Sequence, residues 1–426
     1  MQPMKKIING ILLSASALAF AASPIIAQTT ATPAAAQTCN ADERDKFYND
    51  QFRANYQAKT SDKYKLAIDA AKQYLGKYNA PNCTDNAEII TYLQGWVPKA
   101  EAKLPEMIKQ EKLAKVNDPL TKGDIPGFFA AGKEFTAAYP DDPISLSVML
   151  SMVDNGFIQT DSKKVDTYNN DTIATAKAAI DKINAGKTPV ESSWKPFANK
   201  EDALAWLNYD IAYINLYKVK DAKAATPYFY QVTKYNSPDL SAAYLPYRAI
   251  GDVYLDQLNA AVETYNKSKD DATVPEAKKD ELNGTWKAYA DRALEAYGRA
   301  YAKAKANTKT KPETLKDIND TLTSLYQLRH NKETTGLDAY VAGLSSKPLT
   351  DPTTPVTPVI EVDKTTTGAT NSPTSVVAAA SSADSNGGND RNVKTTATGG
   401  KGNGTTTTKP AATTTKKPSP KKGKGK

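Results

Sequence analysis

The sequence is poor in the residue types on which most enzymes depend. Among 426 residues there is one histidine, His330, and there are two cysteines. A single histidine without a serine or cysteine nucleophile motif nearby provides no candidate catalytic triad. Glycine-rich phosphate loops, His-x-x-Glu-His and cysteine clusters are also lacking. We therefore expect no enzyme, no cofactor and no metal. His330 is expected at a helix end, where it interacts favourably with the helix dipole.

Long apolar runs are scarce as well. The one such run, Ile7–Ala22, follows Lys5 and Lys6 and precedes small residues up to Ala27, which is typical of a cleavable secretory signal. An uncleaved anchor is the alternative, but about 16 apolar residues fall short of the roughly 20 that a membrane span needs. We predict a signal peptide over residues 1–27 and no span in the mature chain. Residues 19–21 offer an earlier cleavage site.

Cys39 and Cys83 both follow the signal. In an oxidising compartment such a pair forms one disulfide by default. Helices predicted over Asp42–Gln57 and Asp62–Tyr78 would form a hairpin that returns Cys83 to the end where Cys39 begins. A metal site or a redox pair would need Cys-x-x-Cys spacing or partner histidines. We therefore expect a structural disulfide.

Positive charge is concentrated near the C-terminus. Residues 364–426 hold eleven Lys and Arg and two Asp, so their net charge exceeds that of the whole chain, which is +8. Since Lys5 and Lys6 of the signal are also positive, residues 28–363 are slightly acidic. The basic pI therefore gives no reason to expect a nucleic-acid partner. Low apolar content predicts a disordered tail over residues 348–426. This tail is a candidate for binding anionic envelope polymers, and a purely solubilising role is the alternative.

Residues 39–347, which follow a spacer at 28–38, are predicted to be all-helical. Their amphipathic stretches alternate with turn residues, and no run of alternating apolar residues indicates a strand. Asp142-Pro143 and Ser237-Pro238 each place a capping side chain before a proline, which predicts two helix starts. Asp118-Pro119 and residues 169–171 are interpreted as loops.

One short pattern recurs in this segment. A small residue is followed by a ring four positions later and by a second small residue three positions after that. Positions 0, 4 and 7 share one face of a helix, so a second helix can approach closely beside the ring. The copies are Ala131-Phe135-Ala138, Ala293-Tyr297-Ala300 and Gly336-Tyr340-Gly343, with a looser one at Ala224-Tyr228-Gln231.

Part of this pattern resembles the tetratricopeptide repeat. The family's first-helix pattern, W-x2-L-G-x2-Y, is matched in spacing by Tyr247, Ile250, Gly251 and Tyr254. Its second-helix pattern, A-x3-F, is matched by Ala293 with Tyr297 and by Ala131 with Phe135, the latter followed by Pro143. The anchors at 131, 224, 293 and 336 are 93, 69 and 43 residues apart, not a steady 34. The resemblance therefore implies an irregular α-solenoid of about 11–13 helices, with protein binding as its role.

Tyrosine, with 23 residues against 9 phenylalanines, is the most suggestive residue type. A ring with a polar tip suits a half-exposed groove. The preferred groove residues are Trp206, Tyr209, Tyr213 and Tyr217. Our leading hypothesis is an exported, non-enzymatic bacterial scaffold, periplasmic or extracellular, that binds proteins of the cell envelope. The alternatives are a glycan or cell-wall binding protein that uses these tyrosines and the basic tail, and an enzyme whose carboxylates come from distant parts of the chain.

Overall fold

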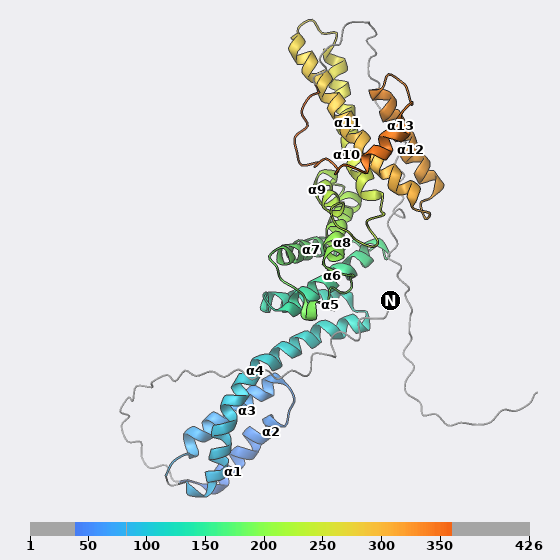
Figure 1. Cartoon of the computed structure of the whole chain (residues 1–426). Coiled ribbons are helices and arrows are strands. Elements are labelled where there is room, and N and C mark those ends of the chain that lie inside the picture. The colour runs from blue at the N-terminus through green and yellow to red at the C-terminus, as the bar shows by residue number, and fades with distance from the viewer. Residues whose placement is uncertain (1–38, 82, 360–426) are drawn as a thin grey trace, which may run out of the picture. The chain divides into compact units, whose positions relative to one another are not determined.

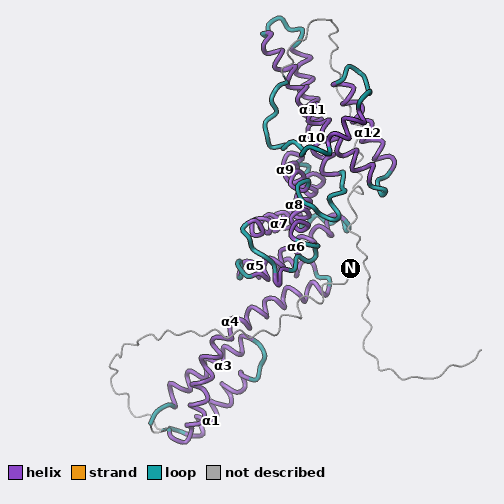
Figure 2. Tube along the Cα trace, viewed as in Figure 1, coloured by secondary structure: helices purple, strands orange, loops and turns teal. Residues whose placement is uncertain are grey.

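The computed structural model describes residues 39–81 and 83–359, and within them there are helices, turns and loops but no strand (Figures 1 and 2). The all-α prediction is thus confirmed for this part of the chain. The predicted signal peptide, the spacer at 28–38 and the basic region at 364–426 lie outside the described residues. Counting the continuous helix at 41–56 once, the described part holds twelve helices, as expected from the sequence.

The helices follow one another with short connections. The first is a continuous helix that contains a π-helical segment, and it consists of α1 (Ala41–Phe47), η2 (Tyr48–Arg53) and α2 (Ala54–Tyr56). Then come α3 (Ser61–Tyr78), η3 (Thr84–Asn86), α4 (Ala87–Lys122), α5 (Ile125–Ala138), α6 (Pro143–Asp161), α7 (Asn169–Asn184), η4 (Val190–Ser192) and α8 (Lys200–Tyr213). The last group is η5 (Ile214–Val219), α9 (Ala222–Val232), α10 (Leu245–Ser268), α11 (Glu276–Ala306), α12 (Pro312–Arg329) and α13 (Leu337–Leu344).

Each helix packs mainly against its neighbours in the sequence. Contacts between consecutive helices run without a gap from α3 to α12, and the most extensive ones join α10 to α11. The last helix, α13, packs on α11 instead. Contacts within the described residues are thus made chiefly between helices that are neighbours in the sequence.

The α10–α11 pair packs closely at Gly251. A Cβ added to Gly251 would lie 2.7 Å from Cδ2 of Tyr297, so the close approach of the two helices depends on glycine. Ala293, Tyr297 and Ala300 are all buried in the main core, as is Tyr254, whereas Tyr247 is half-buried against it.

The earlier copy of the pattern buries its ring but not its two alanines. Phe135 is fully buried, but Ala131 is only half-buried and Ala138 is exposed, so the prediction that both alanines pack against a neighbour is wrong. The close approach occurs at Gly132, where an added Cβ would lie 2.6 Å from Sδ of Met152 in α6. The buried stripe of α5 therefore includes Gly132 in place of Ala131.

Two predicted loops are helical. Asp118-Pro119 lies inside α4, which also contains Pro98 and Pro105. A proline removes one helical hydrogen bond, but α4 is packed on α3 along its first half and on α5 further on, and this tertiary packing outweighs the loss. Asn169 begins α7, and its Oδ1 accepts a 2.5 Å hydrogen bond from buried Thr160 Oγ1, which anchors the helix start.

Only one of the two predicted proline caps starts a helix. Asp142 caps α6, since its carboxylate accepts a hydrogen bond from the Ile144 N–H at 2.8 Å. Ser237 instead stabilises a single turn, in which its Oγ accepts from the Leu240 N–H and donates to the Asp202 carboxylate. This buried turn lies between α9 and α10, and the next helix begins only at Leu245.

Order continues past the predicted domain end at residue 347. Leu349 is 8% exposed and belongs to the main core, and the Val359 N–H donates a 3.0 Å hydrogen bond to the Gly284 carbonyl in α11. We call residues 347–359 the strap. Assigning residues 348–359 to a disordered tail was therefore wrong, because an apolar anchor and several hydrogen bonds compensate for a proline-rich composition.

The predicted disulfide between Cys39 and Cys83 is present, with the two Cα atoms 5.5 Å apart. It closes the hairpin of the first helix and α3. Beside it, the guanidinium of buried Arg44 forms an ion pair with Asp85, which follows Cys83 closely in the chain. The disulfide and this ion pair hold the same end of the N-terminal helices.

Removing the disulfide should destabilise the N-terminal helices. The bond closes a loop of 44 residues, so replacing both cysteines by serine should lower the free energy of unfolding by about 4 kcal/mol in the chain-entropy model. Urea unfolding followed by circular dichroism measures this, and reducing the wild-type protein should reproduce the variant. Equal urea midpoints for the variant and the oxidised wild type would contradict this structural role.

Gly251→Ala should destabilise the α10–α11 pair by about 1–3 kcal/mol, because the added methyl group overpacks the interface with Tyr297. The matched control is Gly95→Ala, at an exposed position of α4 where an added Cβ meets no atom within 4 Å. That control should stabilise the protein by up to about 1 kcal/mol through helix propensity. Similar urea midpoints for both variants would show that close packing at Gly251 is unimportant.

Candidate functional site

The four residues predicted to line a groove belong to the core instead. Trp206, Tyr209 and Tyr213 are each 2% exposed, and Tyr217 is half-buried against the same core. Helix α8 contacts α6, α7 and α9, and every residue from Asp202 to Tyr213 is buried. The prediction that these rings form an accessible surface is therefore wrong.

Polar groups accompany these rings into the core. The Tyr213 hydroxyl donates a 2.9 Å hydrogen bond to the Asp161 carboxylate. Burial raises the pKa of the Asp210 carboxyl well above its ordinary value, and the nearby charge of Asp161 raises it further. Burial likewise raises the pKa of the Tyr209 hydroxyl. An ionised carboxylate at Asp210 is thus unfavourable.

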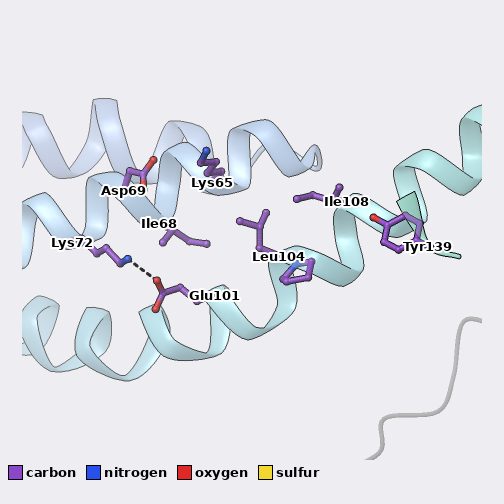
Figure 3. A pocket seen from close by; sticks show the side chains of 9 residues that line it. Lys65, Ile68, Asp69, Lys72, Glu101, Leu104, Ile108 and Tyr139 are labelled. Carbon is purple, nitrogen blue, oxygen red and sulfur yellow. Dashed lines mark ion pairs between the residues drawn. The ribbon is translucent and has the colours of Figure 1, made fainter. Parts of the chain in front are cut away.

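An open groove lies elsewhere, between α3 and α4. It has a volume of about 480 Å³ and is closed at one end by Tyr139, the residue that follows α5. Its lining residues are Lys65, Ile68, Asp69 and Lys72 of α3, Glu101, Leu104, Pro105 and Ile108 of α4, and Tyr139. Figure 3 shows Ile68, Leu104 and Ile108 along the groove, with charged side chains from both helices beside them.

The two walls of the groove have the same residue spacing. On each helix the lining residues occupy positions i, i+3, i+4 and i+7, which form one continuous helix face. Our sequence reasoning missed this site because it did not recognise α4 as a helix. Once α4 is known, the repeated spacing from Lys65 to Lys72 and from Glu101 to Ile108 is the signal that identifies the two walls.

Charged side chains and a proline lie beside the apolar residues of the groove. Lys72 Nζ lies 2.5 Å from Glu101 Oε1, and this ion pair bridges the two walls at one end (Figure 3). Hydrogen bonding to Glu101 raises the pKa of the Lys72 amine. Pro105 has no N–H, so it cannot make the helical hydrogen bond to the Glu101 carbonyl. The groove therefore offers an apolar floor and charges of both signs.

A second exposed feature is an aromatic patch on α2 and α4. Tyr56 is 43% exposed and Tyr92 is 45% exposed, although most large apolar side chains of the described residues are covered. The Tyr56 ring stacks on buried Phe52 with 5.6 Å between centroids, and Trp96 meets both rings edge to face. The exposed Tyr56 ring thus packs on Phe52 and Trp96, and the exposed Tyr92 ring packs on Phe52.

Among residues 39–81 and 83–359, no group of three or more His, Cys, Asp or Glu side chains is placed to hold a metal ion. His330 follows α12 as its C-terminal cap, as predicted, and its ring stacks on Tyr326 at 4.0 Å. Over the same residues, every helix is too short or too polar to cross a membrane.

No protein-family model matches the chain, and no curated protein or solved structure is significantly similar to it.

The burial of Asp210 generates a prediction about pH. Its pKa is raised in the folded protein, so the folded state loses stability as pH rises above about 4, the ordinary value for the unfolded chain. Asp210→Asn removes this ionisation. The variant should gain at least about 1 kcal/mol relative to wild type between pH 4 and pH 8, since each unit of pKa difference is worth 1.36 kcal/mol. Urea unfolding at both pH values tests this, and a gap that does not change with pH would contradict it.

Proposed function

We propose that this chain is an exported, non-enzymatic, tetratricopeptide-like helical scaffold that binds another protein of the bacterial cell envelope in the α3–α4 groove. The observation that carries the proposal is the pair of matched helix faces, which border an apolar floor that the other helices of the described residues leave open. The dense contacts between successive helices and the glycine at the α10–α11 crossing support an irregular solenoid of helical hairpins.

The groove best fits an amphipathic helix of the partner. Side-chain ridges of a third helix can pack between two helical walls whose lining residues recur every three to four positions. Apolar residues of the partner would contact Leu104 and Ile108, which are half-buried, whereas Ile68 lies beneath them and is only 3% exposed. Its flanking residues would carry both signs of charge, because the rim holds Lys65 and Asp69 on one wall and Glu101 on the other.

Export is supported by two observations. The disulfide between Cys39 and Cys83 belongs to an oxidising compartment. The basic, apolar and small-residue order of the first 27 residues is that of a secretory signal. Together they favour a periplasmic or extracellular protein.

Site-specific photocrosslinking in living cells tests the groove. A photoreactive amino acid at position 108 or 65 should crosslink to a discrete protein, because both positions line the groove. The matched control is position 66, which is on α3 and 49% exposed but outside the groove. We expect at least fivefold more of the crosslinked product from the groove positions.

A second variant tests whether the crosslink depends on the apolar floor of the groove. Ile108→Lys should reduce the crosslink formed from position 65 at least fivefold, since it places a charge in the apolar floor, whereas Leu66→Lys should leave it unchanged. Unchanged circular dichroism would show that both variants are folded. Equal yields at positions 65, 66 and 108 would refute the proposal.

The aromatic patch favours a second candidate function, glycan binding. Exposed rings that are fixed in position present flat apolar faces on which a sugar ring can stack. Tyr56 and Tyr92, not the tyrosines of α8, are the residues that the structure leaves accessible for this role.

Retention on insoluble cell-wall polymer tests this alternative. The double variant Tyr56→Ala and Tyr92→Ala should bind at least tenfold more weakly, because two stacking contacts of roughly 1 kcal/mol each are removed. Leu66→Ala serves as a control with a similar exposed fraction. Binding through the rings should persist at about 0.5 M salt, at which binding through the basic tail is screened. Full retention by the double variant would rule the patch out as a glycan site.

A further inference from the structure

The strap lies on α11 in a regular manner. It runs antiparallel to the helix, so that Lys347 is beside Arg299, Thr350 is beside Glu295, and Val359 is beside Gly284. The contacted positions of α11 are Gly284, Arg292, Glu295 and Arg299, which share one face of the helix. Figures 1 and 2 show the segment after α13 returning alongside α10 and α11.

Much of this contact is made to the strap's backbone. Arg299 donates a 2.8 Å hydrogen bond to the Lys347 carbonyl, and Arg292 donates to the Asp351 carbonyl. The Thr350 N–H donates to Glu295. Backbone groups are common to all peptides, so these three α11 side chains would serve another extended segment equally well.

Three features add selectivity. Leu349 inserts into the main core, the Thr350 hydroxyl donates to Glu295 Oε2 at 2.5 Å, and the Thr354 hydroxyl accepts from Arg292 at 3.1 Å. Asp351 turns the backbone by accepting hydrogen bonds from Thr353. Prolines at 348, 352, 355 and 358 favour an extended chain between these anchors.

Glycine at position 284 makes the far end of the site possible. A Cβ there would lie 2.6 Å from the Val359 carbonyl oxygen and 3.0 Å from Pro358 Cβ. Packing of α10 on α11 does not require this glycine, since the atoms nearest to it belong to the strap. The helix surface is therefore shaped to receive an extended backbone.

We propose that this face of α11 is a peptide-binding site, and that the strap is its built-in ligand. The site would take an extended segment of a partner protein that carries a leucine-like anchor followed by Thr-Asp-Pro and further prolines. In the free chain the strap occupies the site at an effective concentration of about millimolar, so a partner segment binds by displacing it. This site is separate from the α3–α4 groove and does not depend on the function proposed for that groove.

The test uses the full-length chain and a fluorescent synthetic peptide of residues 347–359. Leu349→Glu removes the anchor of the strap and places a negative charge near Glu295, which should release the strap in cis. Fluorescence anisotropy should show that the peptide binds this variant at least tenfold more tightly than it binds wild type. Adding Gly284→Leu to the released variant should abolish the gain, whereas adding Gly95→Ala should preserve it.

A cleavable chain keeps the test independent of the Leu349 substitution. A protease site inserted between Ser345 and Ser346 converts the strap into a separate segment after cutting, and excess synthetic peptide should then displace it in gel filtration. The proposal is overturned if the released variant keeps its circular dichroism but gains no affinity, if Gly284→Leu leaves the gain intact, or if the cut strap is not displaced by peptide.

Discussion

Close contact between consecutive helices is the constraint on which the rest of this structure depends. Gly251 beneath Tyr297 and Gly132 beside Met152 allow neighbouring helices to approach until a ring or a thioether fills the space of a missing side chain. Burial of apolar side chains at such crossings is the main stabilising contribution available to a chain of short-range helical contacts. Close contact of α8 with α6, α7 and α9 likewise buries Tyr209 in the core although its hydroxyl is polar.

Packing between sequence neighbours also determines which surfaces stay accessible. The first helix and α4 both contact α3, yet the face of α3 that carries Lys65 and Lys72 is left open beside α4. At α11 a comparable face is covered, but by the strap and not by another helix. Within the described residues, the groove between α3 and α4 is thus open, whereas the strap covers this face of α11.

The sequence predicted local structural features better than it predicted which helix faces are accessible. The disulfide and the capping of α6 by Asp142 each follow from two residues of the sequence, and both are present. The helix around Pro119 was missed because tertiary packing on α3 and α5 overrides the local effect of proline. Similarly, the composition of residues 348–359 gave no hint that Leu349 is an anchor in the core.

The candidate site could not have been predicted from residue types alone. Spacing of four residues places Tyr209, Tyr213 and Tyr217 on one helix face, but it does not reveal that α7 and α9 cover α8. Conversely, nothing in the sequence of α3 shows that one of its faces lacks a covering helix. Exposure of a face depends on the positions of all the neighbouring helices, which only the fold specifies.

The central claim is that the α3–α4 groove is occupied by a partner in the cell envelope. It is tested most directly by measuring how fast a maleimide labels Ile108→Cys in the intact envelope and in the purified protein, with Leu66→Cys as the reference. The account predicts slow labelling at position 108 in the envelope and fast labelling after purification, while position 66 reacts alike in both. Equal labelling of position 108 in the two settings would contradict it.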